Sequence, residues 1–120
     1  MKGAKAARIP GEAAEAAVGR LREMSADLRG CALLGPGCEV LAATGDAERW
    51  GPAAADLLAA ADEAGDEPAS HVHVATEDGE TFAVREGGYA MVAVSERFTL
   101  ASLMIFDMRA VLRDLARDGA

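Results

Sequence analysis

The sequence has few aromatic residues, a deficit of basic residues and no long apolar run. Aromatic side chains make up 4% of the 120 residues, so the core must be built mainly from Ala, Leu and Val. Twelve Lys and Arg stand against twenty Asp and Glu, for a net charge of −8. Because nucleic-acid binding relies on an excess of Lys and Arg, a DNA or RNA partner is not expected.

No apolar run approaches the roughly 20 residues that a membrane-spanning helix needs, and the first residues lack the apolar segment of a secretory signal. We therefore expect a cytoplasmic protein without membrane insertion. The two cysteines, Cys31 and Cys38, agree with a reducing compartment. On the predicted hairpin they lie roughly 13 Å apart at about 3.3 Å per residue, which is too far for a disulfide.

Positive charge is concentrated at the start of the chain. Lys2, Lys5 and Arg8 fall in the first eight residues, where there is no acid. We expect residues 1–10 to form a flexible leader and residues 11–118 to form a single domain.

The first three predicted elements are a helix, a hairpin and a second helix. Apolar residues at three- and four-residue spacing predict a helix from Gly11 or Glu12 to Arg29, closed by Gly30. Two apolar runs around Pro36 and Gly37 predict strands near 31–35 and 39–44. The next apolar stripe predicts a helix from Ala47 or Pro52 to Ala64. Its members are Ala54, Leu57, Leu58 and Ala61.

The stretch from His71 to Ser95 predicts a three-stranded antiparallel meander, with turns at EDGE and EGG. A two-residue turn at Asp78-Gly79 would place Val74 opposite Ala83. A three-residue loop, Glu77 to Gly79, places Val72 and Val74 on the face of Phe82 and Val84, and we favour it. The other face would then hold Ala75, Ala83, Tyr89, Met91 and Ala93.

A last helix is expected from Leu100 to Arg117, with Thr99 as its N-cap. Its apolar stripe is Leu100, Leu103, Met104, Met108, Val111, Leu112 and Leu115. The meander is apolar on both faces, which requires cover on both sides. The sequence therefore predicts an α/β fold, in which three helices flank one five-stranded antiparallel sheet in the order helix, strand, strand, helix, three strands, helix.

No pattern in the chain indicates catalysis, a cofactor or a metal. The serines have no GxSxG context, and no Gly-Lys-Ser/Thr follows the glycines as a phosphate-binding loop requires. His71 and His73 share a strand face, and Glu86 could lie opposite His71 in one register. Without another Cys or His nearby, we interpret both histidines as polar residues of an edge strand.

The order of elements and their punctuation resemble the Roadblock/dynein light chain family over residues 12–117. The segments that carry the resemblance are LRGCALLGPGCEVLAATG, AAADLLAAADEA and ATEDGETFAVREGGYAMVAV, followed by the last helix. The GPG turn departs from the acidic residue and Gly that the family usually has there. The resemblance implies a sandwich related to profilin and longin domains.

The resemblance also implies a homodimer, joined through sheet edges and the second helices. It makes the following residues candidates for the dimer interface: Trp50, Leu57, Leu58, Ala61, Val72 and Val74. Val74→Pro is then expected to weaken the dimer by removing a donor from the edge strand.

The function that the resemblance implies is non-enzymatic regulation of a small Ras-like GTPase. Possible contacts are Arg49, Arg85, Arg109, Arg113 and Arg117. Two alternatives remain open at this point, a small-molecule sensor of profilin-like fold and an adaptor that only dimerises and tethers other proteins.

Overall fold

The computed structural model describes residues 11–119, so the predicted leader lies outside the described residues. Eight elements follow one another in the predicted order. They are α1 (Gly11–Met24), β1 (Leu28–Leu34), β2 (Val40–Ala43), α2 (Ala47–Ala64), β3 (His71–Ala75), β4 (Glu80–Glu86), β5 (Tyr89–Ser95) and α3 (Ala101–Gly119). The predicted fold class, three helices around a five-stranded antiparallel sheet, is confirmed.

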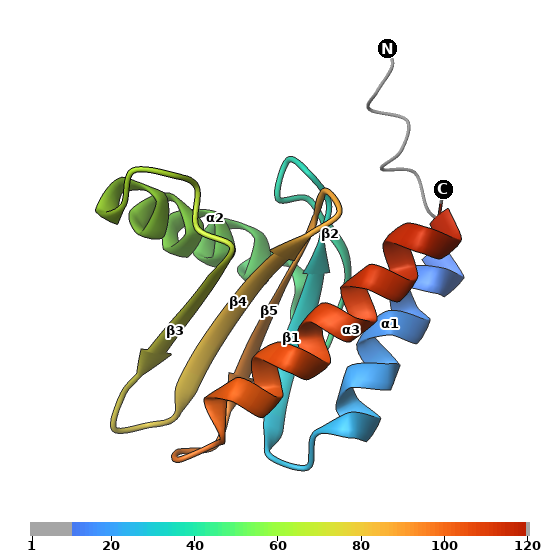
Figure 1. Cartoon of the computed structure of the whole chain (residues 1–120). Coiled ribbons are helices and arrows are strands. Elements are labelled where there is room, and N and C mark those ends of the chain that lie inside the picture. Colours follow the sequence, from blue (N-terminus) through green and yellow to red (C-terminus); the bar gives the residue numbers. More distant parts are fainter. Residues whose placement is uncertain (1–10, 120) are drawn as a thin grey trace.

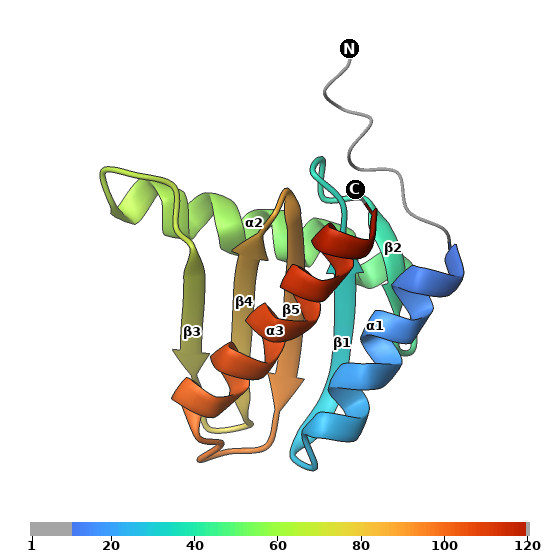
Figure 2. The ribbon, with the colours of Figure 1, turned by 45° about the vertical axis from the view of Figure 1, so that its right-hand side comes forward.

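The helices lie on both faces of the sheet. Figure 1 shows α1 and α3 side by side on one face and α2 on the other. The strands are ordered β2-β1-β5-β4-β3, so β2 and β3 are the two edges (Figure 2). A sheet that is apolar on both faces requires this double cover, as the sequence predicted.

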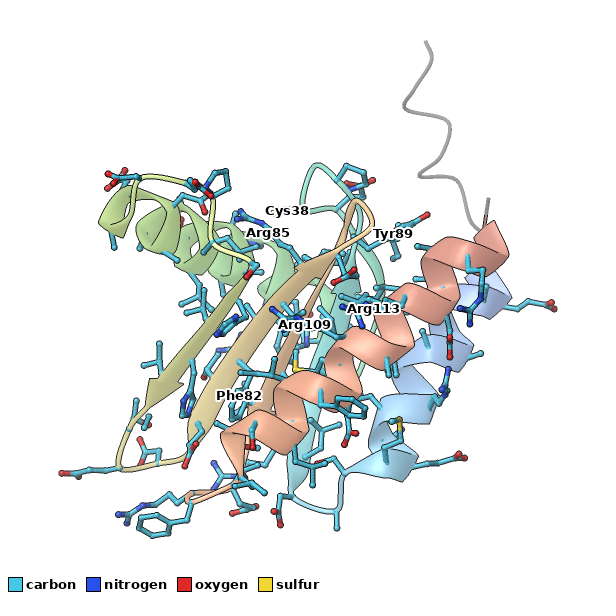
Figure 3. All side chains as sticks on the ribbon, viewed as in Figure 1. Cys38, Phe82, Arg85, Tyr89, Arg109 and Arg113 are labelled. Carbon is cyan, nitrogen blue, oxygen red and sulfur yellow. The ribbon has the colours of Figure 1, made fainter. Side chains whose placement is uncertain are left out.

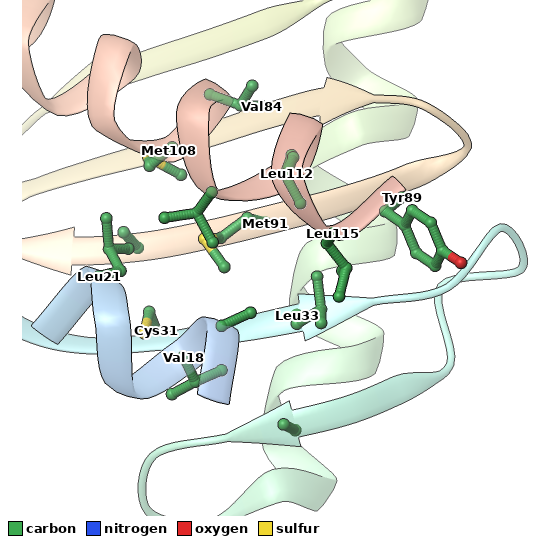
Figure 4. Close-up of a cluster of buried hydrophobic side chains, with 14 of the residues drawn as sticks. Val18, Leu21, Cys31, Leu33, Val84, Tyr89, Met91, Met108, Leu112 and Leu115 are labelled. Carbon is green, nitrogen blue, oxygen red and sulfur yellow. The ribbon is translucent and has the colours of Figure 1, made fainter. Parts of the chain in front are cut away.

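The core on the α1 and α3 side is the larger of the two. Figure 4 shows Val18 and Leu21 of α1 meeting β1, β4 and β5 beneath α3, with Leu33 and Met91 fully buried. A second core joins α2 to the sheet's other face. Its buried members are Ala32, Leu34, Ala54, Leu58, Ala83, Ala90 and Val92. These small alanine side chains allow α2 to lie close to the strands, so this core is filled without aromatic residues apart from the half-buried Trp50.

The predicted register of the meander is wrong by one residue. Val72 pairs with Ala83 and His73 with Phe82, so the loop is the four residues from Thr76 to Gly79. Thr76 organises this loop, because its N–H and its hydroxyl both donate to the Gly79 carbonyl, at 2.8 and 2.9 Å. Side chains paired across strands share a face.

The register also reassigns the two faces of the sheet. The valines of β3 face α2, and the histidines face α3. Tyr89, Met91 and Ala93 lie with Phe82 and Val84 in the larger core, while Ala83 lies in the smaller one, which corrects their predicted grouping.

The first helix is shorter than predicted. It ends at Met24, and Leu28, Arg29 and Gly30 belong to β1. Gly30 is therefore no helix cap. A Cβ at this position would lie 2.9 Å from the Thr44 hydroxyl and 3.4 Å from the Trp50 ring, so close packing explains this glycine.

The hairpin turn also differs from its prediction. Gly35 pairs with Glu39, whose carbonyl accepts the Gly35 N–H at 2.9 Å, and the loop therefore has three residues. Cys38 closes the loop at a φ of 64°, a left-handed conformation that is uncommon outside glycine. Both cysteines are free thiols, as predicted.

Two predictions for α3 are wrong at its start. The Thr99 hydroxyl donates to the Glu96 carbonyl at 2.7 Å, while the Leu100 carbonyl accepts the Met104 N–H, so Thr99 is not the residue that begins the helix. Leu100 and Leu103 are also solvent-exposed, at 65% and 53%. The remainder of the predicted stripe is buried, from Met104 to Leu115.

Candidate interface at the free sheet edge

Strand β3 forms an edge of the sheet with nothing paired to its outer side in the described chain. Its side chains are largely exposed, including Val74 at 40%. The sheet contains no proline or bulge in this strand to discourage pairing. An edge strand of this kind offers a row of backbone donors and acceptors to another chain.

Two hydrogen bonds establish which β3 backbone groups remain available. The Arg85 N–H donates to the Ser70 carbonyl at 2.9 Å, and the Thr76 N–H donates to the Gly79 carbonyl at 2.8 Å. Inward and outward bonding alternates along an antiparallel strand. Val72 and Val74 therefore bond to β4, while His71, His73 and Ala75 direct their N–H and carbonyl groups outward. The reasoning that Val74→Pro removes an edge donor is thus wrong.

Arg85 fixes the start of this edge strand. Its guanidinium makes a two-pronged ion pair with Asp62 of α2, at 2.7 and 3.1 Å, and donates to the Ala69 carbonyl at 2.9 Å. Asp62 also accepts the Ala69 N–H at 2.9 Å. The Arg85 hydrogen bonds hold the pKa of Asp62 below its ordinary value. Figure 3 shows Arg85 at the end of β4 close to α2. Its role is to clamp the loop between α2 and β3.

His73 and Glu80 fix the other face of the edge. The His73 ring stacks on Phe82, with centroids 4.5 Å apart, and its Nε2 lies 2.7 Å from the Glu80 carboxylate. Glu80 is buried, at 7% exposure, and accepts the Phe98 N–H at 2.6 Å. The hydrogen bond with His73, followed by those from backbone N–H groups, holds the pKa of Glu80 below its ordinary value. The carboxylate thus ties β3 to the segment before α3.

Sequence reasoning missed this pairing, although a signal for it exists. Glu80 alternates with Phe82 and Val84 along β4, so an acid falls on a strand face that is otherwise core. A charge at a core position needs a partner.

The predicted interface residues of α2 divide between its inner and outer sides. Leu58 is 2% exposed and packs on the sheet. Trp50 is half-buried, and its Nε1 donates to the Thr44 carbonyl at 3.0 Å. Leu57 is partly buried on the same core. Ala61 is partly exposed. No contact between copies tests these residues or Val72 and Val74, so their interface role stays a prediction.

The outer side of α2 is built mainly from small and acidic side chains. The exposed residues of its last three turns are Ala53, Asp56, Ala59, Ala60, Glu63 and Ala64. Helices pack at a distance that depends on the side chains between them, so alanines allow a second helix to approach closely. Figure 2 shows α2 reaching across the sheet to the β3 edge. The edge and the small-residue surface are therefore adjacent.

The arginines of α3 are largely engaged within the chain. Arg113 pairs with Glu86 at 3.2 Å, and Arg117 pairs with Asp114. Arg109 contacts the Ser70 hydroxyl and the His71 ring instead of an acid. They line an open groove of about 640 Å³ beside α3. Figure 3 shows Arg109 and Arg113 extending from α3 over the sheet.

His71 and His73 gain no further metal ligand from the part of the chain that the structure describes. Val84, not Glu86, lies opposite His71, so the third ligand considered for the histidines is absent from that position. Among residues 11–119 no three His, Cys, Asp or Glu side chains gather closely enough to hold an ion. Within the same range no helix is both long and apolar enough to span a bilayer.

The arrangement of this sheet and its helices is that of the Roadblock/LC7 fold. A Roadblock/LC7 domain from Streptomyces avermitilis is similar over 87% of this chain and 95% of its own, with a TM-score of 0.76 and 15% identity. Myxococcus xanthus MglB is similar over 92% of this chain and 90% of its own, with a TM-score of 0.76 and 14% identity. The gliding protein MglB from Thermus thermophilus gives a TM-score of 0.75 and 15% identity over the same shares.

The predicted resemblance to Roadblock domains is confirmed at the level of the fold. No family model matches the chain, and no curated protein matches its sequence. The likeness to known proteins is therefore one of structure, at 14–15% sequence identity.

Proposed function

We propose that the chain is a non-enzymatic, homodimeric regulator of the Roadblock type, which binds a small Ras-like GTPase and modulates its nucleotide state. The observation that carries this proposal is the free β3 edge in a sheet of Roadblock/LC7 fold. One solved neighbour, 19% identical, is described as MglB with a tetrameric arrangement, which supports self-association in proteins of this shape.

In the proposed dimer, β3 of one copy pairs with β3 of the other. The donors and acceptors come from His71, His73 and Ala75, whose backbone groups point outward. This pairing would continue the sheet through both copies and bring the two α2 helices together over the seam. The structure favours Val74, Ala61 and the outer alanines of α2 as contacts, since Leu58 is buried within its own chain.

GTPase binding rests on the resemblance to Roadblock proteins and on the missing catalytic constellation in the sequence. Arg49 is an exposed arginine of α2, and its side chain makes no hydrogen bond or ion pair within residues 11–119. It is a better contact candidate than Arg85, whose guanidinium is used by Asp62. The proposed partner surface therefore includes the start of α2.

The test uses a Ras-like GTPase encoded in the same genome. Solution mass by sedimentation equilibrium first establishes whether the chain is a dimer. The GTPase, loaded with GDP or with a slowly hydrolysed GTP analogue, is then titrated with the chain. Phosphate release from GTP is followed in parallel. We expect binding that depends on the nucleotide and a changed hydrolysis or exchange rate.

The adaptor alternative predicts a dimer with no effect on the GTPase's nucleotide. A monomer at high concentration would contradict the proposed dimer. The variant Arg49→Glu, compared with Glu48→Gln next to it, tests the contact, because only the first reverses the unpaired positive charge. Equal binding by both variants would exclude Arg49 from the contact.

A further inference from the structure

Helices α1 and α3 run side by side, and an ion pair joins them. Arg20 of α1 donates to Asp114 of α3 at 2.5 Å. Asp107 lies seven residues earlier on α3, which is about two turns or roughly 10 Å along the axis on the same side. At that level α1 supplies Met24 instead of a cation. The second acid of the contact therefore has no counterpart.

Asp107 is buried without a partner. Its exposure is 8%, and within residues 11–119 its carboxylate makes no hydrogen bond and no ion pair. No fully enclosed polar side-chain atom of the described residues is left unbonded, so the unpaired carboxylate oxygens reach the adjoining cleft. Burial raises the pKa of the Asp107 carboxyl above its ordinary value. An unpaired buried carboxylate is costly, so a cation placed beside Asp107 would be strongly favoured.

The cleft that Asp107 lines is small and has an apolar rim. Its volume is about 120 Å³, between the end of α1 and the start of α3. Met24, Leu100 and Leu103 border it with exposures of 39, 65 and 53%. Asp27 adds a second acid at the side. The space admits the end of one long side chain and excludes a nucleotide.

We propose that this cleft binds a Lys or Arg side chain from an amphipathic segment of a partner protein, whose apolar residues cover Met24, Leu100 and Leu103. The cation would repeat, at the cleft, the pairing that Arg20 makes with Asp114 about two turns further along α3. Charge complementarity selects a basic segment, because the two acids of the cleft, Asp27 and Asp107, have no cation in it. Neighbouring exposed apolar side chains, here Met24, Leu100 and Leu103, are a mark of an interaction site.

This site is separate from the proposed dimer and GTPase surfaces. It lies on the α1 and α3 side of the sheet, whereas α2 covers the opposite side (Figure 1). A bound partner segment would therefore leave both the α2 surface and the β3 edge accessible.

The experiment is a nuclear magnetic resonance titration of the full chain with two synthetic peptides. The first is a helical peptide of Leu, Lys and Ala, about 14 residues or roughly four turns long, with Leu and Lys on one face. The second replaces each Lys with Glu. We expect the Lys peptide to shift the amide signals of residues 24–28 and 99–107, and the Glu peptide to leave them unchanged.

Variants then assign the binding to the cleft. Asp107→Asn is expected to weaken binding of the Lys peptide about tenfold or more, because a desolvated charge pair then loses one of its two partners. Asp56→Asn, on the exposed side of α2, removes the same charge and should change binding less than twofold, roughly the effect of a distant surface charge. Leu103→Ser should weaken binding without unfolding the protein, because its side chain is exposed.

Several results would overturn the proposal. Equal affinities of Asp107→Asn and Asp56→Asn would show that the acidic surface attracts the peptide without a site. The proposal would also be overturned if the amide signals that shift lay outside the two segments, or if the unmodified chain did not bind the Lys peptide. Replacing Lys2, Lys5 and Arg8 together with Ser provides a last control. If that variant bound the peptide much more tightly, the chain's own first residues would be the occupant and a separate partner would be excluded.

Discussion

Val74 and Ala75 are neighbours on β3, yet their backbone N–H groups point to opposite sides of the strand. The Val74 group bonds to β4, opposite Thr81, and the Ala75 group points to the free edge. Proline at Val74 would therefore remove a donor to β4, whereas proline at Ala75 would remove a donor at the free edge. The sequence alone could not distinguish these two effects, because the direction of each N–H depends on the register of the strand.

We predict that Ala75→Pro weakens self-association without destabilising the monomer. Proline removes a donor that the monomer does not use, and the extended backbone of a strand accommodates its fixed φ. Sedimentation equilibrium should show a dimer dissociation constant raised about tenfold or more, the effect of removing about 1.4 kcal/mol. Val74→Pro, by contrast, should lower the urea midpoint of the chain because it breaks the pairing with β4.

The matched control is Ala75→Ser, which keeps the N–H and should leave the dimer intact. If Ala75→Pro had the same dissociation constant as this control, the copies would not meet through β3. The α2 surface would then have to be tested by itself, for example with Ala60→Arg.

The element order could be predicted from the sequence because each element has its own periodicity and clear turn residues. Register and helix ends could not. The loop from Thr76 to Gly79 depends on a side-chain hydroxyl that bonds a carbonyl three residues on, a contact with no periodic signal. Leu28 fits the apolar spacing of a helix, but pairing with Ser95 recruits it into β1. Tertiary pairing here overrides a local pattern.

We predict that Glu80→Gln lowers stability at neutral pH and flattens its dependence on acid. The folded pKa of Glu80 lies below the ordinary 4.5. Above pH 4.5 both states are ionised, and the contacts to His73 and the Phe98 N–H contribute fully. As the pH falls, the unfolded chain takes up the proton first, so this stabilisation is lost through the folded pKa.

Urea midpoints measured between about pH 3 and 7 check this prediction. The unmodified chain should lose stability more steeply on acidification than the Gln variant. Glu77→Gln, in the exposed loop before Glu80, is the control and should retain the steep acid limb. Parallel curves for the chain and Glu80→Gln would show that the carboxylate is not what ties β3 to the segment before α3.

The features that the sequence analysis missed share a physical reason. Glu80 and Asp107 are acids placed among apolar residues, on a core strand face and in the stripe of α3. Periodicity marks such positions as exceptions, but it cannot say whether a partner exists. Only the folded chain brings His73 to Glu80 and leaves Asp107 opposite Met24. The hydrogen bond with His73 lowers the pKa of the Glu80 carboxyl, whereas burial without a partner raises the pKa of the Asp107 carboxyl.

Gly79 is predicted to tolerate no side chain. A Cβ there would lie 2.5 Å from the Ser95 carbonyl oxygen and 2.9 Å from Nη1 of Arg29. The Arg29 side chain could move aside, but the Ser95 carbonyl is part of the β5 backbone and could not. Gly79→Ala should therefore cost about 1–3 kcal/mol of unfolding free energy, as overpacking does. Gly88→Ala, where a Cβ meets open space, provides the comparison.

Gly88 has a φ of 87°, so its alanine variant carries backbone strain but no clash. Gly79 also has a positive φ, 158°, so the clash is what distinguishes the two variants, and urea unfolding of both measures its cost. Gly79→Ala should be the less stable of the two. Equal midpoints would show that the strands at this end of the sheet are held less closely than the structure places them.

The two cysteines should differ sharply in reactivity. Cys31 is fully buried in the larger core, and burial raises the pKa of its thiol to about 11. Little thiolate is then present at pH 8, and reagent has no access to it. Cys38 is partly exposed at the hairpin loop.

Native chain treated with Ellman's reagent should release colour for one thiol quickly and for the second only at the rate of unfolding. Cys38→Ser should abolish the fast phase. A fast phase that survived this substitution would mean that β1 opens to solvent while the remainder of the sheet stays folded, which is inconsistent with its place between β2 and β5.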